Sequence, residues 1–272
     1  MSDIFLAALV SGAFAGFAVD VSLYPIDTLK TRLQSPKGFL ASGGFTGIYR
    51  GLGSVAIGSA PGAALFFTVY ETSKFYTPDN SLGHMMSASF GEIAACLVRV
   101  PTENVKTRMQ INSSNSSLSK TVKQILKGEG VRNMYNGFGI TLMREIPFAF
   151  IQFPIYERMK LLVSTYQSEP ASPIQSAICG SFGGAIAAAV TTPLDVVKTR
   201  LMVGEDIQGV KYTSVGDTVK RIVRDEGRMT LLNGIQPRIM WISIGGFVFF
   251  GAYEACKGIV GNVVGSRKRE GI

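Results

Sequence analysis

The chain has few of the residues that enzymes commonly use for chemistry. Its 272 residues include three cysteines, one histidine and one tryptophan, and only 17% are charged. Cys96, Cys179 and Cys256 have no paired or metal-ligand spacing. No nucleophile–base pair, zinc cluster or phosphate-binding glycine loop is visible around His84 or elsewhere. We therefore expect no catalytic activity, no metal site and no cofactor.

Acidic residues are also scarce, with 19 against 27 basic residues and a net charge of +8. The basic residues are dispersed between apolar stretches, which argues against a nucleic-acid partner and favours contact with anionic lipid head groups. The chain is 46% hydrophobic, typical of a membrane protein with polar loops. No cleavable leader is expected, because the sequence enters an apolar run at Ile4.

One eight-residue phrase occurs three times, each time at the end of an apolar run. The copies are PIDTLKTR at 25–32, PTENVKTR at 101–108 and PLDVVKTR at 193–200. They share the pattern proline, any residue, acid, two residues, base, any residue, base. The sequence is therefore a threefold tandem repeat.

A second repeated phrase confirms this register. Tyr-Glu-x-x-Lys occurs at 70–74, 156–160 and 253–257, each time 19 residues after a glycine. At about 1.5 Å per helical residue, 19 residues span roughly 28 Å, close to the hydrocarbon core of a bilayer. The spans expected from these patterns are 5–26, 51–70, 84–101, 137–156, 174–193 and 235–253.

The connections after the repeated phrases differ in length. Amphipathic segments at 118–128 and 214–225 predict a short helix in the second and third connections, whereas the first has room for about one helical turn. Each phrase begins with a proline, at Pro25, Pro101 and Pro193. These prolines predict either a kink or the end of the preceding helix.

The triple P-x-[DE]-x-x-[KR]-x-[KR] phrase, the Tyr-Glu-x-x-Lys set and six spans resemble the mitochondrial carrier family over essentially the whole chain. The resemblance implies an all-α membrane protein with six transmembrane helices and threefold pseudosymmetry around one cavity. It also implies the mitochondrial inner membrane, with both termini in the intermembrane space. The corresponding division of the chain is repeats at 1–78, 79–165 and 166–262, then a basic tail at 263–272.

Charged residues within a membrane cost about 2.5–3.5 kcal/mol each on insertion scales, so they are expected to pair. Within each phrase the acid and base lie three residues apart on one helix face, and threefold geometry allows pairing between repeats. Ordinary snorkelling at helix ends is the alternative. The resemblance implies a matrix gate of Asp27–Lys106, Glu103–Lys198 and Asp195–Lys30. It also implies that Gln34 and Gln110 brace this gate by hydrogen-bonding to its ion pairs. Met202 occupies the corresponding third position.

The resemblance implies a second gate on the cytoplasmic side, which should not be closed at the same time as the first. Its pairs are Glu71–Lys160, Glu157–Lys257 and Glu254–Lys74, and its braces are Tyr70, Tyr156 and Tyr253.

Charges between the gates are candidates for substrate binding. Glu92 and Arg99 lie 11 and four residues before Glu103, and Asp20 lies seven before Asp27. At 100° per residue, all three share a helix face with a signature acid. The resemblance places Arg144 and Glu145 at a further contact point, with Gly58 and Trp241 at the equivalent positions.

Structural roles remain open for several of these residues. Trp241 could anchor the helix in the core or at the interface, and Glu92 could hydrogen-bond across a helix interface. Glu145 could pair with Arg144 or Arg99, and Arg99 could serve the nearby gate.

Segments such as FAVDVSLYPIDTLKTRLQSPKGF, GEIAACLVRVPTENVK and REIPFAFIQFPIYE resemble the subgroup of this family that imports S-adenosylmethionine in exchange for S-adenosylhomocysteine. That substrate carries a carboxylate, an ammonium, a sulfonium and an adenine. Arg144 suits the carboxylate, Asp20 and Glu92 the cationic groups, and Trp241 the adenine or a cation, with Gly58 leaving room for the ring. Another cationic amino-acid-like or adenine-containing solute, or a non-transporting receptor, is the alternative. Cardiolipin is an expected lipid partner, and a monomer the expected functional unit.

Overall fold

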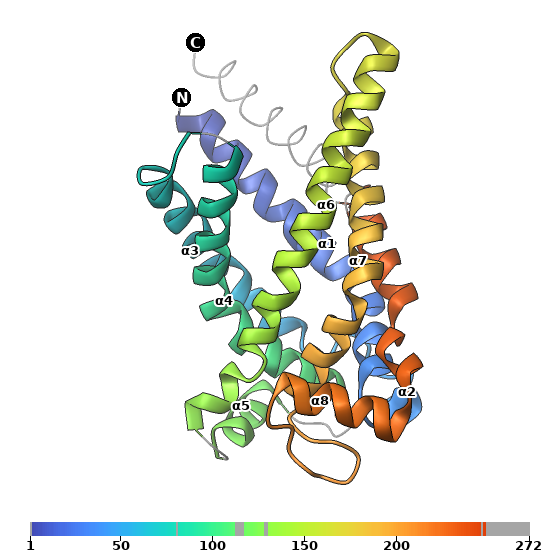
Figure 1. The fold of residues 1–272 in the computed structure, drawn as a ribbon. Coiled ribbons are helices and arrows are strands. Elements are labelled where there is room, and N and C mark those ends of the chain that lie inside the picture. Colours follow the sequence, from blue (N-terminus) through green and yellow to red (C-terminus); the bar gives the residue numbers. More distant parts are fainter. Residues whose placement is uncertain (1, 80, 112–116, 128–129, 246, 249–272) are drawn as a thin grey trace.

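The computed structural model describes residues 2–79, 81–111, 117–127, 130–245 and 247–248. These residues fold as a bundle of long helices (Figure 1). The long helices are α1 (Ser2–Gln34), α3 (Leu52–Lys74), α4 (Ser81–Ile111), α6 (Phe138–Gln167) and α7 (Pro173–Val203), and residues 235–245 form a further helical stretch.

Short helices lie at the end of the bundle opposite Ser2 (Figure 1). They are α2 (Gly38–Ala41), α5 (Leu118–Lys127) and α8 (Val215–Arg221), with one π-helical turn at Ile222–Glu226 and 3₁₀ turns at Gly130–Tyr135 and Arg228–Leu232. The prediction of one turn in the first connection and longer helices in the other two is confirmed.

The three signature prolines lie inside continuous helices, which excludes the alternative that they end the helices. Proline at position i removes the N–H that would bond the carbonyl at i−4. For Pro101 this carbonyl belongs to Leu97, and the Tyr135 hydroxyl donates to it at 3.1 Å. A side chain from the following connection thus satisfies the carbonyl that the proline leaves free.

The glycines that open the second half of each repeat allow neighbouring repeats to approach closely. Gly51 has φ 89° and Gly234 has φ 79°, both in the left-handed region that glycine adopts without strain. A Cβ on Gly51 would lie 3.2 Å from the Lys106 carbonyl oxygen, and one on Gly234 equally close to that of Lys30. Each glycine therefore sets its helix directly against a signature lysine of another repeat.

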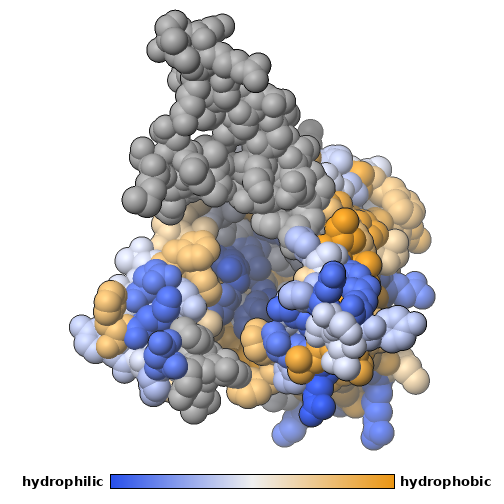
Figure 2. All heavy atoms as spheres, turned by 90° about the horizontal axis from the view of Figure 1, so that it is seen from above, coloured by the Kyte–Doolittle hydropathy of each residue, from blue (hydrophilic) through white to orange (hydrophobic). Residues whose placement is uncertain are grey.

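The distribution of polar side chains is inverted relative to a soluble protein. Asn104, Gln110 and Thr192 are fully buried, whereas Phe67 and Phe150 are well exposed. By length and composition, α3 and α7 are, among the described residues, the helices apolar enough to cross a membrane. Figure 2, a view from above the bundle, shows hydrophilic side chains in the recess between the helices. The apolar exterior and polar interior suit a membrane protein with an internal pathway.

Candidate functional site

The signature acids and bases meet in a ring at the end of the bundle where the long helices converge. Lys106 Nζ lies 2.7 Å from Asp27 Oδ2, Lys30 Nζ lies 2.7 Å from Asp195 Oδ2, and Lys198 Nζ lies 2.6 Å from Glu103 Oε2. Every pair joins two different repeats. We call these six residues the signature ring; its pairs are the three that the family resemblance implied.

Two glutamines reinforce the signature ring. Gln110 Nε2 donates to Asp27 Oδ2 at 3.0 Å, and Gln34 Nε2 donates to Asp195 Oδ2 at 2.9 Å. Thr199 in turn donates its hydroxyl proton to Gln34 Oε1 at 2.7 Å, which fixes the orientation of that amide. The thioether of Met202 occupies the third position and offers no amide donor to Glu103. The ring therefore has two braced pairs and one unbraced pair.

Asp195 has more cationic partners than the other two ring acids. Besides Lys30, its carboxylate lies 2.8 Å from Arg238 Nη1 and 3.7 Å from Arg144 Nη1. Arg238 is 2% exposed. We did not expect Arg238 from the sequence, although one signal was available. It stands four residues after Gly234, where the other repeats have Val55 and Thr141.

At the opposite end the acid–base phrases are not joined across repeats among the described residues. Glu71 pairs with Lys74 of its own helix at 3.4 Å, so the expected Glu71–Lys160 contact is absent in this conformation. Lys160 instead lies over the Tyr156 ring, 5.5 Å from its centroid. Figure 1 shows that α3 and α6 diverge toward this end of the bundle, which separates the two phrases.

The other described residues of the expected cytoplasmic gate also form no ion pair between repeats. Lys74 lies over the Tyr70 ring at 5.3 Å, and the described residues give Glu157 no ion pair. Tyr253, Glu254 and Lys257 lie outside the described residues. The conformation is thus joined at the signature ring and open at the Glu71–Lys160 position.

Between the two ends, charged candidates pair with each other. Arg99 and Glu92 form an ion pair along α4, with Cys96 Sγ 3.7 Å from the same Glu92 oxygen. Arg144 and Glu145 pair as neighbours on α6, which resolves the open choice for Glu145 in favour of Arg144. Arg144 therefore lies between Glu145 and the ring acid Asp195.

Asp20 and Trp241 occupy half-buried positions on α1 and on the helix at 235–245. The described residues give Asp20 no ion-pair partner. No described ring or cation contact involves Trp241.

Gly58 does not leave space for a substrate ring, and that expectation is corrected. A Cβ at Gly58 would lie 2.5 Å from Thr102 Cγ2 and 2.7 Å from Thr102 Oγ1. The absent side chain instead lets α3 pack tightly against α4. Gly58 thus has a helix-packing role in this conformation.

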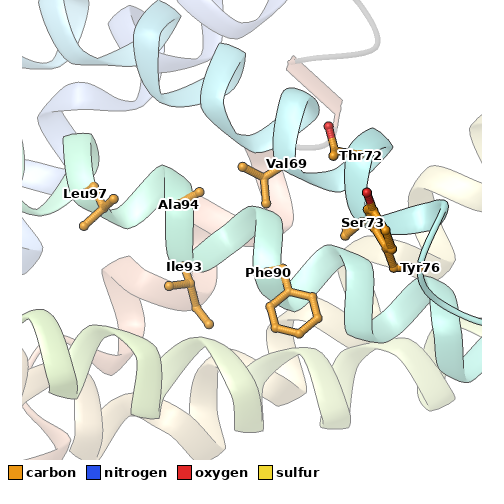
Figure 3. Close-up of a pocket in the computed structure, with 8 residues that line it drawn as sticks. All are labelled: Val69, Thr72, Ser73, Tyr76, Phe90, Ile93, Ala94 and Leu97. Atoms are coloured by element: carbon orange, nitrogen blue, oxygen red, sulfur yellow. The ribbon is translucent and has the colours of Figure 1, made fainter.

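A separate groove between α3 and α4 is lined mainly by apolar side chains (Figure 3). Its volume is about 490 Å³, and its lining includes Val69, Phe90, Ile93 and Leu97. None of the charged candidates above lines it. A charged solute would find no counter-charge there, so we do not assign the groove to the substrate.

Repeated helix pairs around internal charges, joined at one end among the described residues, are typical of a membrane transporter. The chain belongs to the mitochondrial carrier family, because the family model described as "Mitochondrial carrier protein" matches residues 2–81, 77–167 and 169–263. It has the all-α fold of that family, whose members are transporters rather than enzymes.

Individual relatives match over nearly their full length. The chain is 47% identical over 258 residues to the mitochondrial S-adenosylmethionine carrier protein of Xenopus tropicalis, covering 92% of this chain and 94% of that protein. The protein of the same name from Mus musculus is 45% identical over 262 residues, with coverages of 94% and 95%. The putative mitochondrial carrier protein PET8 of Saccharomyces cerevisiae is 48% identical over 269 residues, with coverages of 92% and 93%.

Proposed function

We propose that this chain imports S-adenosylmethionine into the mitochondrial matrix in exchange for S-adenosylhomocysteine. The observation that carries the proposal is the 45–47% identity, over more than nine-tenths of both chains, to proteins named for that substrate. We further propose the inner membrane, termini in the intermembrane space, a monomeric unit, cardiolipin as a lipid partner and repeat boundaries near 78, 165 and 262.

The charges between the two ends support a zwitterionic, cationic substrate. In the proposed binding mode the guanidinium of Arg144 binds the substrate carboxylate in a bidentate fork. Asp20 and Glu92 then face the ammonium and the sulfonium. Trp241 stacks on the adenine or the cation. Arg99 and Glu145 hold Glu92 and Arg144 until the substrate arrives.

Alternating access follows from competition for Arg144. Without substrate, Arg144 is shared between Glu145 and Asp195. A substrate carboxylate bound to Arg144 would withdraw it from Asp195 and weaken one corner of the signature ring. In this proposal the signature ring is the matrix gate, with Gln34 and Gln110 as braces. Glu71, Glu157, Glu254 and their lysines, with the three tyrosines, form the cytoplasmic gate.

Uptake by purified protein in liposomes tests the proposal. We expect labelled S-adenosylmethionine to enter only vesicles preloaded with S-adenosylmethionine or S-adenosylhomocysteine. External S-adenosylhomocysteine should compete, whereas lysine and ADP should not. Competition by lysine with none by S-adenosylhomocysteine would indicate a basic amino-acid carrier. Absence of any uptake would favour the receptor alternative.

The charge of the two solutes sets the driving force. S-adenosylmethionine carries a net charge of +1 at neutral pH and S-adenosylhomocysteine carries none. One-for-one exchange therefore moves one positive charge inward, worth about 2.3 kcal/mol per 100 mV of inside-negative potential. An imposed potassium-diffusion potential should accelerate exchange of the unlike pair and leave exchange of like for like unchanged. Equal acceleration of both would contradict strict one-for-one exchange.

A further inference from the structure

Arg238 is the buried cation that the sequence comparison did not anticipate. It lies on the helix at 235–245, and the two polar contacts found for it among the described residues are with α7. Its Nη1 lies 2.8 Å from Asp195 Oδ1, and its Nη2 donates to Thr191 Oγ1 at 2.8 Å. The Thr191 hydroxyl donates a hydrogen bond to the Ala187 carbonyl at 2.7 Å, so its oxygen is oriented to accept one from Arg238.

The two oxygens of Asp195 divide their partners between elements. Oδ2 receives Lys30 and Gln34, both from α1. Oδ1 receives Arg238, with Arg144 of α6 farther away. One carboxylate therefore joins α7 to three other helices of the bundle.

The helix that carries Arg238 is itself packed against α1. Gly234 approaches so closely that a Cβ there would lie 3.2 Å from the Lys30 carbonyl oxygen and 3.2 Å from Gln34 Cγ. Farther along, a Cβ on Gly245 would lie 3.5 Å from Leu23 Cδ1. If α7 moves away from α1, Asp195 therefore moves away from Lys30 and from Arg238 together.

We propose that Arg238 is a second latch on the matrix gate, a positioning residue that holds Asp195 closed in parallel with Lys30. The inference rests on the proposed alternating access of this pore. It makes the gate asymmetric, because the corresponding positions Val55 and Thr141 in the other repeats carry no charge. The Asp195 corner thus has Arg238 in addition to Lys30, whereas among the described residues the Glu103 corner is closed by Lys198 alone.

The single tryptophan provides a reporter for this latch. Trp241 lies one helical turn beyond Arg238, on the same helix. We suggest full-length protein in liposomes with its matrix face outward, an orientation checked by protease cleavage at the exposed Lys211. Iodide added outside then quenches Trp241 fluorescence only to the extent that the matrix gate is open.

Three substitutions that each remove one positive charge are compared. K30Q removes the known ring lysine, R238Q removes the proposed latch, and R224Q removes an exposed arginine bonded only to Asp225 among the described residues. Because all three variants have the same net charge, the overall electrostatic attraction of the protein for iodide is the same in each. We expect K30Q and R238Q each to raise the quenching constant by about twofold or more as the open population grows, and R224Q to leave it unchanged.

Quenching of R238Q equal to that of the wild type would overturn the latch and leave Arg238 as a packing residue. If R238Q cannot be recovered folded, R238K and T191A decide the question. Each weakens one half of the two-point contact, and each should raise quenching by less than K30Q does. No rise in either variant contradicts the proposal. Wild-type protein that fails to take up S-adenosylmethionine would contradict the proposed substrate while leaving these quenching results interpretable.

Discussion

The two ends of the bundle contain similar acid–base phrases but use them differently. At the signature ring, three pairs join different repeats at 2.6–2.7 Å. At the other end, Glu71 pairs among the described residues with Lys74 of its own helix, at 3.4 Å. The Glu71 side chain is 62% exposed, whereas that of Asp195 is 3% exposed. Sequence phrases alone therefore do not make a ring; helix convergence does.

The difference in burial also sets the energetic consequences. An exposed ion pair within one helix contributes about 0.2–0.5 kcal/mol. Removing one partner of a buried pair costs about 3–5 kcal/mol, because the remaining charge is left without compensation. Removing one charge at the signature ring should therefore cost much more stability than removing one charge at the opposite end.

Neutralising the most connected acid should have the largest effect. D195N leaves Lys30, Arg144 and Arg238 facing a neutral amide in a buried site. We expect this conformation to lose about 3–5 kcal/mol, measured as a large drop in the thermal unfolding midpoint in detergent. D225N, at an exposed pair, is the control and should not shift the midpoint. A D195N midpoint equal to that of D225N would remove the distinction between the two ends.

Arg144 links the middle of the pathway to the closed end, and its loss should primarily reduce transport. Charged hydrogen bonds contribute about 1.5–3 kcal/mol, so R144A should lower initial S-adenosylmethionine uptake by about 10- to 100-fold. R144K keeps the charge but not the fork, and should recover part of the rate. R158A, at an exposed position on the same helix, serves as control. Normal uptake by R144A would exclude it as the carboxylate ligand.

Adding the missing brace should strengthen the closed end. M202Q places an amide where the other two repeats have Gln34 and Gln110, within reach of the unbraced Glu103–Lys198 pair. We expect about 1 kcal/mol of stabilisation of the closed ring, with a higher unfolding midpoint and slower exchange. M202L keeps the apolar packing against Cys96 and Val100 without adding a donor. The idea fails if M202Q and M202L behave alike.

The smallest effect on stability should come from the open end. E71Q removes an exposed contact within one helix, so we expect less than about 0.5 kcal/mol in the unfolding midpoint assay. Exchange should nevertheless slow, because in the proposed mechanism Glu71 pairs with Lys160 when the cytoplasmic gate closes. R158Q is the matched control, since it also removes one exposed charge from this half of the bundle. A loss of stability comparable to that of D195N would show that this end is also closed.

The repeats in the sequence predicted the contacts of the signature ring and the lengths of the connections. The phrases at 25–32, 101–108 and 193–200 carry the family resemblance, and that resemblance implied the three pairs that the structure forms, the two glutamine contacts and the gap at Met202. These contacts could be anticipated because the residues that make them belong to a local phrase copied three times. The lengths of the three connections were equally visible from the amphipathic segments at 118–128 and 214–225.

Departures from the repeat were harder to predict. The positions equivalent to Arg238 in the other repeats are Val55 and Thr141, which are uncharged, so a comparison of the three repeats does not point to it. Gly58 lies 12 residues before Tyr70, the position of a substrate contact in the other repeats according to the family resemblance. In the structure, however, a Cβ added at Gly58 would point at Thr102. Both depend on which helix lies opposite a given face, and spacing within one helix does not contain that information.

The repeated phrases determined by themselves that this protein is a threefold tandem repeat of membrane spans with charges in threefold register, and the carrier fold followed from the family resemblance that they carry. Only the tertiary structure decided that the proline-containing helices continue to the ring, that one end is joined while the other is open, and that Asp195 gathers two extra arginines. The physical reason is that pairing of buried charges depends on distances between helices, which are set by close contacts such as those at Gly51 and Gly234.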